Sequence, residues 1–141
     1  HPLTMLSLAF NYAISGNQAG SYHLFNLLLH LINTFLVFKL ASRLSNKNNI
    51  ISFATALLFG IHPMHVESVA WISERKDVLS TFFFLLSIIS YQEYFQKKSR
   101  ISFYIFSWLL FLLSLLSKAM TITLPVVLLL IDFVWLLNSL R

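Results

Sequence analysis

The run YHLFNLLLHLINTFLVFKLAS, residues 22–42, decides the fold of this chain. It stays apolar over the roughly 20 helical residues that cross a hydrocarbon core about 30 Å thick, so it predicts a transmembrane helix. Four polar residues recur along it at three- and four-residue spacing and therefore share one side of that helix: His23, Asn26, His30 and Asn33. Such a stripe is costly against lipid and is expected to face protein or a cavity.

Two interpretations of this polar stripe are open. Its residues either form hydrogen bonds between helices, which stabilise a bundle, or they line a functional cavity. We expect Asn26, His30 and Asn33 to bond to neighbouring helices, and His23, near the outer end, to reach a candidate site.

The composition of the whole chain agrees with a membrane protein. Its 141 residues are 57% hydrophobic and 11% charged, with a mean hydropathy of +0.76, whereas soluble domains carry about 25% charged residues. Such a chain cannot cover its own surface with polar groups, which excludes an ordinary water-soluble globule, and it is too apolar for a disordered segment. The absence of cysteine excludes disulfides, thiolate zinc sites and cysteine nucleophiles.

The formal net charge of +5 reflects membrane orientation rather than a nucleic-acid partner. Seven of the ten Lys and Arg residues lie at sites that one membrane face can share: Lys39, Arg43, Lys47, Lys97, Lys98, Arg100 and Arg141. Cytoplasmic loops are enriched in these residues, so we expect this face to be cytoplasmic. The opposite, non-cytoplasmic face then holds three cations and three matching acids: Arg75, Lys76, Lys118, Glu67, Glu74 and Asp77.

Four more apolar segments follow the first, and an amphipathic one precedes it. We expect membrane helices over residues 22–42, 49–62, 76–95, 101–117 and 121–138. The second is short for a span, which predicts either a locally thin membrane or a buried irregular stretch over 63–71 that dips back into it. Residues 3–15 are too few to span and predict an interfacial amphipathic helix that ends at Gly16.

These expectations define one domain of all-α membrane class. It is a polytopic helical bundle of about five transmembrane helices with an N-terminal interfacial helix. Residues 1–21 form the external helix and its turn, and residues 22–141 form the membrane helices. Because the chain starts at His1 and ends just after an apolar run, we expect it to be a segment of a longer polytopic protein.

The connection HPMHVESVAWISERKD, residues 62–77, is the candidate site. Ionisable groups near the membrane plane are costly unless paired or facing water, so they mark function more often than scaffold. If the second half continues as a helix, a carboxylate, an aromatic ring and a guanidinium share one face beside a cavity: Glu67, Trp71, and Glu74 or Arg75. The alternative is an interfacial loop of solvated charges, with Trp71 in the aromatic belt.

His62 and His65 raise the question of a metal site, because two imidazoles and the nearby Glu67 could ligate zinc or manganese. Pro63 between the histidines interrupts helical spacing, and the chain lacks an H-E-x-x-H pattern. We therefore predict no metal. His62 is expected to end the second membrane helix, and His65 is expected to form a hydrogen bond in the cavity.

Lys118 lies at a tight turn on the non-cytoplasmic side. It either snorkels to the interface or joins Arg75 and Lys76 around an anion. A phosphate at a membrane surface is bound by charge-assisted hydrogen bonds of this kind, bidentate where arginine supplies them.

Short runs along nearly the whole chain resemble one family: HPLT at 1–4, YHL at 22–24, NLLLH at 26–30, HPMHVESVAW at 62–71, ERKD at 74–77, SK at 117–118 and TLP at 123–125. They are similar to the membrane domain of the transmembrane and tetratricopeptide-repeat-containing proteins, with the bacterial members most similar. The resemblance implies a GT-C-type glycosyltransferase fold related to protein O-mannosyltransferases.

The resemblance also implies a reaction. Such enzymes take a hexose from a polyprenyl-phosphate carrier on the non-cytoplasmic face and pass it to a Ser or Thr hydroxyl of a protein, with no separate cofactor. Arg75 and Lys118, assisted by Lys76, would hold the donor phosphate. The pocket would be formed by the remaining candidate residues: His23, His62, His65, Glu67, Trp71 and Glu74.

The family implies further parts outside these residues. An acidic general base in the first external loop is expected upstream of His1, so these residues would form part of the donor site. Tetratricopeptide repeats that bind the acceptor are expected after the membrane domain. We expect the membrane to be a bacterial inner membrane, or that of the endoplasmic reticulum in a eukaryote.

Two other classes stay open. A transporter or flippase segment would line a pathway with the polar stripe and the outer charges, but it should repeat a pair of interrupted helices. Only Pro63 and Pro125 interrupt the apolar runs, without clear symmetry. A non-catalytic membrane assembly subunit would leave the charges solvated and would hold no site.

Overall fold

The computed structural model describes residues 1–97 and 101–139, without the side chains of residues 96–97 and 134–139. The described chain is helical, in the order α1 (Pro2–Ser15), α2 (Ala19–Leu44), α3 (Asn49–Ile61), α4 (Met64–Ala70), η1 (Ile72–Glu74), α5 (Arg75–Lys97), α6 (Ile101–Ser117), η2 (Ala119–Thr123) and α7 (Leu124–Ser139), where η marks a 3-10 helix. This confirms the predicted all-α membrane class. Each predicted membrane segment forms a helix with bounds close to those expected.

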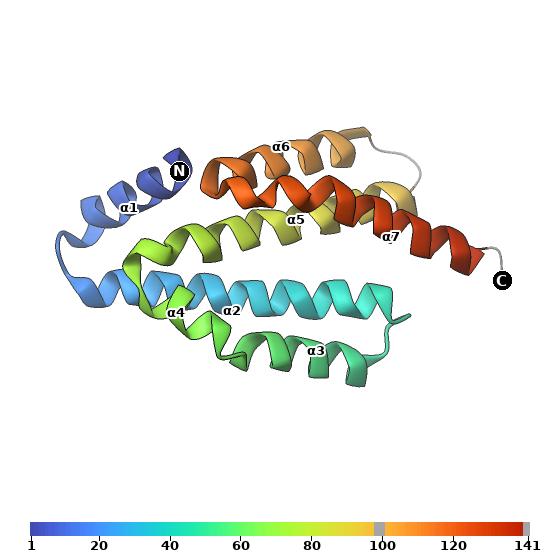
Figure 1. The fold of residues 1–141 in the computed structure, drawn as a ribbon, viewed down its shortest axis with the longest axis horizontal. Helices are drawn as coiled ribbons and strands as arrows, with labels where there is room; N and C mark the ends of the chain where they lie inside the picture. Colours follow the sequence, from blue (N-terminus) through green and yellow to red (C-terminus); the bar gives the residue numbers. More distant parts are fainter. Residues whose placement is uncertain (98–100, 140–141) are drawn as a thin grey trace.

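The long helices lie side by side in a bundle (Figure 1). α5 packs against both α2 and α6, and α3 packs along α2. α1, α4, η1 and η2 lie at one end of the bundle, and the α2–α3 connection lies at the other (Figure 1).

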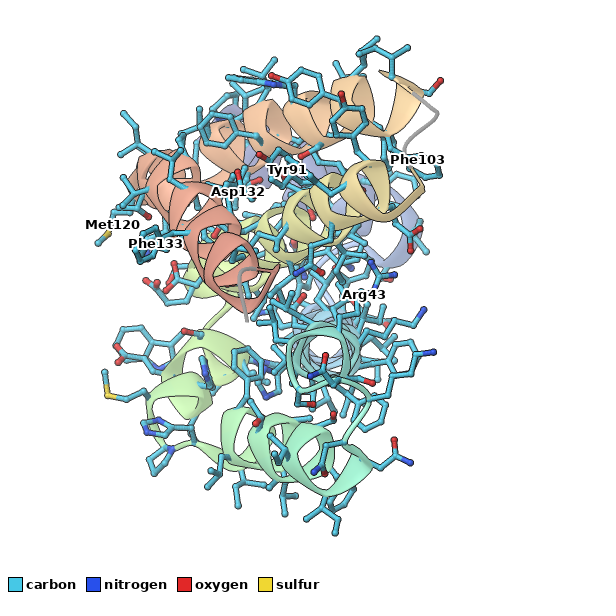
Figure 2. The ribbon with its side chains drawn as sticks, turned by 90° about the vertical axis from the view of Figure 1, so that its right-hand side faces the viewer. Arg43, Tyr91, Phe103, Met120, Asp132 and Phe133 are labelled. Atoms are coloured by element: carbon cyan, nitrogen blue, oxygen red, sulfur yellow. The ribbon has the colours of Figure 1, made fainter. Side chains whose placement is uncertain are left out.

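The opposite end carries basic residues predicted to be cytoplasmic. Arg43, near the end of α2, forms an ion pair with Glu93 of α5 and donates to Ile89 O at 3.3 Å. Figure 2 views the bundle from this end, with Arg43 between α2 and α5. Four more of the basic residues predicted to be cytoplasmic lie outside the described part of the structure: the Lys97 side chain, Lys98, Arg100 and Arg141.

The interior combines an apolar core, which includes Leu29, Val78 and Leu79, with many small polar side chains, and large apolar side chains cover the outside. Ser87 Oγ donates to Ser107 O, and Ser107 Oγ donates to Ser87 O, both at 2.9 Å, which ties α5 to α6. Small residues let two helices approach closely, as in membrane helix pairs. Large side chains such as Phe35, which is 55% exposed, point outward. A lipid surrounding suits this distribution, because apolar atoms on the outside cost nothing there.

α7 is tied to the bundle by a polar contact. Tyr91 OH of α5 donates to Asp132 Oδ2 of α7 at 2.7 Å (Figure 2). A carboxylate within an apolar helix requires such a polar neighbour, because lipid offers none. Phe133, the next residue, is exposed on the outer side of α7.

Among the described residues, two or three helices are long and apolar enough to cross a membrane. By length and composition, α2 and the helical run Ile72–Phe95 can cross a membrane, and α3 with α4 makes a third if that pair, bent by 59°, is one broken span. α6 and the described apolar run Ala119–Phe133 are only 10–17 residues long. α7 itself continues to Ser139, so the predicted number of about five spans stays a prediction.

The predicted irregular stretch over residues 63–71 is a short helix instead. Pro63 is the N-cap of α4, and Trp71 ends it in extended backbone with φ −93° and ψ 127°. The chain then resumes as η1 and α5. One continuous helix through residues 67–77, the condition for their common face, is therefore not formed, because the backbone turns at Trp71.

α1 is amphipathic, as predicted, and its polar side faces the protein. Thr4 and Asn11 are both 5% exposed, whereas Phe10 and Ile14 are 62% and 70% exposed. Asn11 Nδ2 donates to Ser21 Oγ at 3.1 Å, which folds α1 back against α2. The helix thus offers an apolar outer face to its surroundings, and its predicted place at the membrane interface stays a prediction.

Gly60 marks a close approach of α3 to α2 and provides a test. A Cβ at Gly60 would lie 3.1 Å from Thr34 Cγ2, and Thr34 is held in place because its hydroxyl donates to His30 O at 2.9 Å. We expect Gly60→Leu to separate the helices at a cost of about 1–3 kcal/mol, seen as a lower Tm in detergent. Gly20→Leu is the control, because nothing lies within 4 Å of the Cβ position at Gly20. Equal Tm values for the two variants would contradict this packing.

Candidate functional site

A cavity of about 520 Å³ opens between α2, α3, α4, α5 and η2. Its size lies within the range of about 300–1,000 Å³ that is typical of ligand sites. Two charged side chains and four polar ones from α2 and α4 contribute to its lining: Asp77, Lys118, His30, Asn33, His65 and Ser68. We call it the Lys118 cavity.

Lys118 and Asp77 form an ion pair in this cavity. Lys118 Nζ lies 2.5 Å from Asp77 Oδ1, and Ser68 Oγ lies 3.5 Å from Asp77 Oδ2. Lys118 follows the last residue of α6 in extended backbone, and Asp77 lies in the first turn of α5, where a helix N-terminus favours a carboxylate. The two side chains are 25% and 26% exposed, so a ligand can reach the pair.

Arg75 has a different environment, with none of its surface exposed. Its guanidinium donates four hydrogen bonds, to Asn26 Oδ1 (2.9 Å), Asn11 Oδ1 (2.8 Å), Tyr22 O (3.1 Å) and Ser7 O (3.3 Å). The centre of the Phe25 ring lies 4.7 Å from the guanidinium carbon, a cation–π distance. We call this set of contacts the Arg75 hub.

The Arg75 hub bears on the prediction that Arg75 binds the donor phosphate. All four acceptors are neutral, so amide and carbonyl dipoles stabilise the buried charge, and a planar guanidinium with five N–H groups can engage them together. These acceptors come from α1 and α2, so Arg75 holds three helices together. A phosphate could reach it only if α1 moved away. The predicted direct contact between Arg75 and a donor phosphate therefore stays a prediction.

Four other predicted residues of the run 62–77 do not line the Lys118 cavity: Glu67, Trp71, Glu74 and Lys76. Lys76 Nζ pairs with Glu74 Oε1 at 3.1 Å, and neither side chain lines the cavity. Glu67 and Trp71 are exposed. Because the backbone is extended at Trp71, the predicted common face of these residues with Arg75 is not formed.

A second cavity of about 590 Å³ gathers the three histidines predicted for the pocket, His23, His62 and His65, and it is also lined by His30 of the polar stripe. His30 and His65 also line the Lys118 cavity, and their ring centroids lie 5.4 Å apart. His62 is the C-cap of α3, as predicted. Within residues 1–97 and 101–139, no three His, Cys, Asp or Glu side chains lie close enough to hold a metal ion. The predicted hydrogen bond of His65 in the cavity stays a prediction.

The polar stripe of α2 forms hydrogen bonds to neighbouring segments, as predicted for three of its residues. Their partners are backbone carbonyls: Trp71 O for Asn26 (3.1 Å), Gly60 O for His30 (3.0 Å) and Val78 O for Asn33 (2.8 Å). His23 is exposed. These three side chains are buried and bonded to backbone, so they join helices as predicted. His30 and Asn33 also border the Lys118 cavity.

Sequence reasoning missed the role of Asp77, which it counted only among the acids of the outer face. The charge balance could have revealed it. Lys118 is a cation that needs an anionic neighbour on its own side, and Asp77 lies within the run already chosen as the candidate site. What the sequence lacks is the register that brings the start of α5 beside the end of α6.

Comparison with known proteins gives consistent matches. Residues 1–141 match the family described as dolichyl-phosphate-mannose-protein mannosyltransferase. The chain is 40% identical over 91 residues to protein O-mannosyl-transferase TMTC1 of Mus musculus, 43% over 90 residues to TMTC2 of Homo sapiens, and 36% over 122 residues to Tmtc1 of Drosophila melanogaster. These alignments cover 64%, 64% and 86% of the chain, and 10%, 11% and 14% of the relatives. No solved structure matches the chain.

The relatives agree with the family to which the short sequence runs were likened. The central run that carried the resemblance, residues 62–77, contains both Arg75 of the hub and Asp77 of the Lys118 cavity. The more specific expectation of a bacterial-type member stays a prediction.

The Arg75 hub predicts a large loss of stability on substitution. Arg75→Met leaves the side-chain oxygens of Asn11 and Asn26 without their donor, so we expect the free energy of unfolding to fall by about 3–5 kcal/mol. Arg43→Met is the control. It breaks an ion pair whose side chains are 25% and 20% exposed, and it should cost about 1 kcal/mol or less.

Chemical unfolding in detergent measures both variants, and limited proteolysis reports on α1 directly. Release of α1 in the Arg75→Met protein should speed cleavage near Gly16, where α1 ends. An Arg75→Met protein as stable as the Arg43→Met protein would show that the hub does not hold the helices together.

Proposed function

The chain belongs to the dolichyl-phosphate-mannose-protein mannosyltransferase family, and we propose that it forms part of a membrane enzyme that transfers a hexose from a polyprenyl-phosphate carrier to a protein hydroxyl. It spans 10–14% of the length of the curated relatives described above. Their names give the sugar as mannose and the acceptor as a protein, which supports a Ser or Thr hydroxyl as the acceptor here.

The observation that supports this proposal most directly is the Lys118–Asp77 pair in its cavity. Lys118 is a cation that a ligand can reach, and its ammonium can donate charge-assisted hydrogen bonds to a phosphate. Asp77 Oδ1 lies 2.5 Å from this ammonium. When a phosphate arrives, the three N–H groups of Lys118 can serve the phosphate and Asp77 together.

The chemistry requires stabilisation of a leaving group. The oxygen of the acceptor hydroxyl forms a bond to the anomeric carbon, and the bond between that carbon and the phosphate oxygen breaks, so that the electron pair stays on the phosphate. Lys118 stabilises the negative charge that grows there. The hydroxyl proton goes to a general base, for which the family resemblance suggests an acid upstream of His1.

Neighbouring side chains supply the rest of the proposed site. His65, which lines both cavities, would orient the donor or the acceptor, and His23 and His62 would extend the pocket. Lys76, which is partly exposed and pairs with Glu74, would assist Lys118 in holding the donor phosphate. In this proposal Arg75 does not contact the donor in the arrangement described. It stabilises the site by holding α1, α2 and α5 together.

The distribution of charge supports a non-cytoplasmic site. Arg43 lies at the end of the bundle opposite α1 and η2 (Figures 1 and 2), and the basic residues Lys39 and Lys47 lie in or just after the second half of α2. Cytoplasmic ends of membrane helices are enriched in Lys and Arg. The Lys118 cavity would then open on the other side, in a bacterial inner membrane or that of the endoplasmic reticulum.

Substitution of Lys118 tests the proposal in the full-length protein. We expect Lys118→Ala to lower the rate of mannose transfer from polyprenyl-phosphate mannose to an acceptor peptide by about 100-fold, because it removes a charge that stabilises the leaving group. Lys118→Arg keeps the positive charge, so its rate of mannose transfer should fall much less. Lys39→Ala is the control, since Lys39 lies on the exposed side of α2 over Phe35.

Binding of polyprenyl phosphate by the same proteins separates the alternatives. Transfer at the wild-type rate in Lys118→Ala would refute the role of Lys118. Specific binding and movement of the carrier without sugar transfer would favour a flippase. Neither binding nor transfer by the wild-type protein would favour an assembly subunit.

A further inference from the structure

Thr4 of α1 contacts the residue that precedes Lys118. Thr4 Oγ1 donates to Ser117 O at 3.1 Å, in a buried contact between residues 113 positions apart. Thr4 and Ser117 are 5% and 0% exposed. Ser117 is the last residue of α6, and the last carbonyls of a helix have no partner within that helix. Thr4 therefore supplies a hydrogen bond to a carbonyl that needs one.

The backbone of Lys118 itself is held by local bonds. Lys118 N donates to Ser114 O at 2.9 Å, and Lys118 O accepts from Thr121 Oγ1 at 2.8 Å. These partners come from within four residues of Lys118. Thr4 is different, because it belongs to the first helix and ties the peptide in front of Lys118 to a distant part of the chain.

The same helix also reaches the neighbourhood of Asp77. In the Arg75 hub, the guanidinium donates to Ser7 O and Asn11 Oδ1 of α1, and Arg75 lies two residues before Asp77. One face of α1 therefore contacts the chain next to both members of the Lys118–Asp77 pair. Displacement of α1 would loosen both sides of the pair.

We propose that α1 sets the position of Lys118 relative to Asp77, and that Thr4 is the positioning residue through which it acts on Lys118. The inference rests on the proposed function, since it assigns Thr4 a role only if Lys118 binds the donor phosphate. Thr4 touches no reacting atom. It fixes the peptide from which Lys118 extends, and small displacements of a group that stabilises the transition state are costly in rate.

The first test compares Thr4→Val with Thr4→Ser in the full-length protein. Valine has nearly the shape of threonine but no hydroxyl, whereas serine keeps the hydroxyl. We expect Thr4→Val to lower kcat for mannose transfer about tenfold with little change in KM for the acceptor peptide, and Thr4→Ser to stay within about twofold of wild type. Equal kcat values for Thr4→Val and wild type would overturn the inference.

The second test is a double-mutant cycle between Thr4 and Lys118, with affinity for sugar-free polyprenyl phosphate as the readout. If Thr4 acts through Lys118, Thr4→Val weakens binding several-fold in the wild-type background and has no further effect in Lys118→Ala. The same loss in both backgrounds would mean that Thr4 acts on stability alone, and it would overturn the inference while leaving the proposed function intact.

Failure of the proposed function looks different in the same cycle. If Lys118→Ala binds polyprenyl phosphate as tightly as wild type does, Lys118 is not a phosphate ligand. The proposed role of Lys118 then fails, and the role of Thr4 fails with it.

Discussion

One buried guanidinium joins the parts of this structure that are far apart in sequence. Inside lipid there is no water to satisfy polar groups, so each must find its partner within the protein. Arg75 has five N–H groups, and the two asparagine oxygens and two carbonyls around it come from α1 and α2. This need for mutual satisfaction explains why α1 turns its polar side inward and why its apolar residues remain outside.

The Arg75 hub also explains how three similar cations acquire different roles. Arg75 is enclosed, Lys76 pairs with Glu74 near the surface, and Lys118 faces a cavity with Asp77. Charge alone does not separate these cases. Their partners separate them: Arg75 donates to four neutral acceptors, which a guanidinium can engage together, whereas Lys76 and Lys118 each pair with an acid.

The sequence predicts much of the fold because its signals are periodic. The polar stripe of α2 has helical spacing, and its side chains bond to backbone carbonyls, as interhelical contacts in membranes do. The amphipathic pattern of residues 3–15 predicts α1, and Pro63 correctly marks a break after His62.

The features that the sequence did not predict depend on local backbone geometry or on register. The extended backbone at Trp71 separates Glu67 from Arg75 and has no clear sequence signal. The pairing of Asp77 with Lys118 depends on how α5 and α6 align, a long-range property that composition and spacing do not contain. In both cases the sequence identifies the residues but does not predict which other residues they contact.

The order in which the chain is made gives the hub a further consequence. Asn11 and Asn26 leave the ribosome 64 and 49 residues before Arg75 does. During that interval their side chains have no guanidinium to bond, and bare amides in lipid are costly. Until the start of α5 emerges, the side-chain oxygens of both asparagines lack the donor that they have in the folded bundle. This end of the bundle can therefore be completed only after Arg75 has been synthesised.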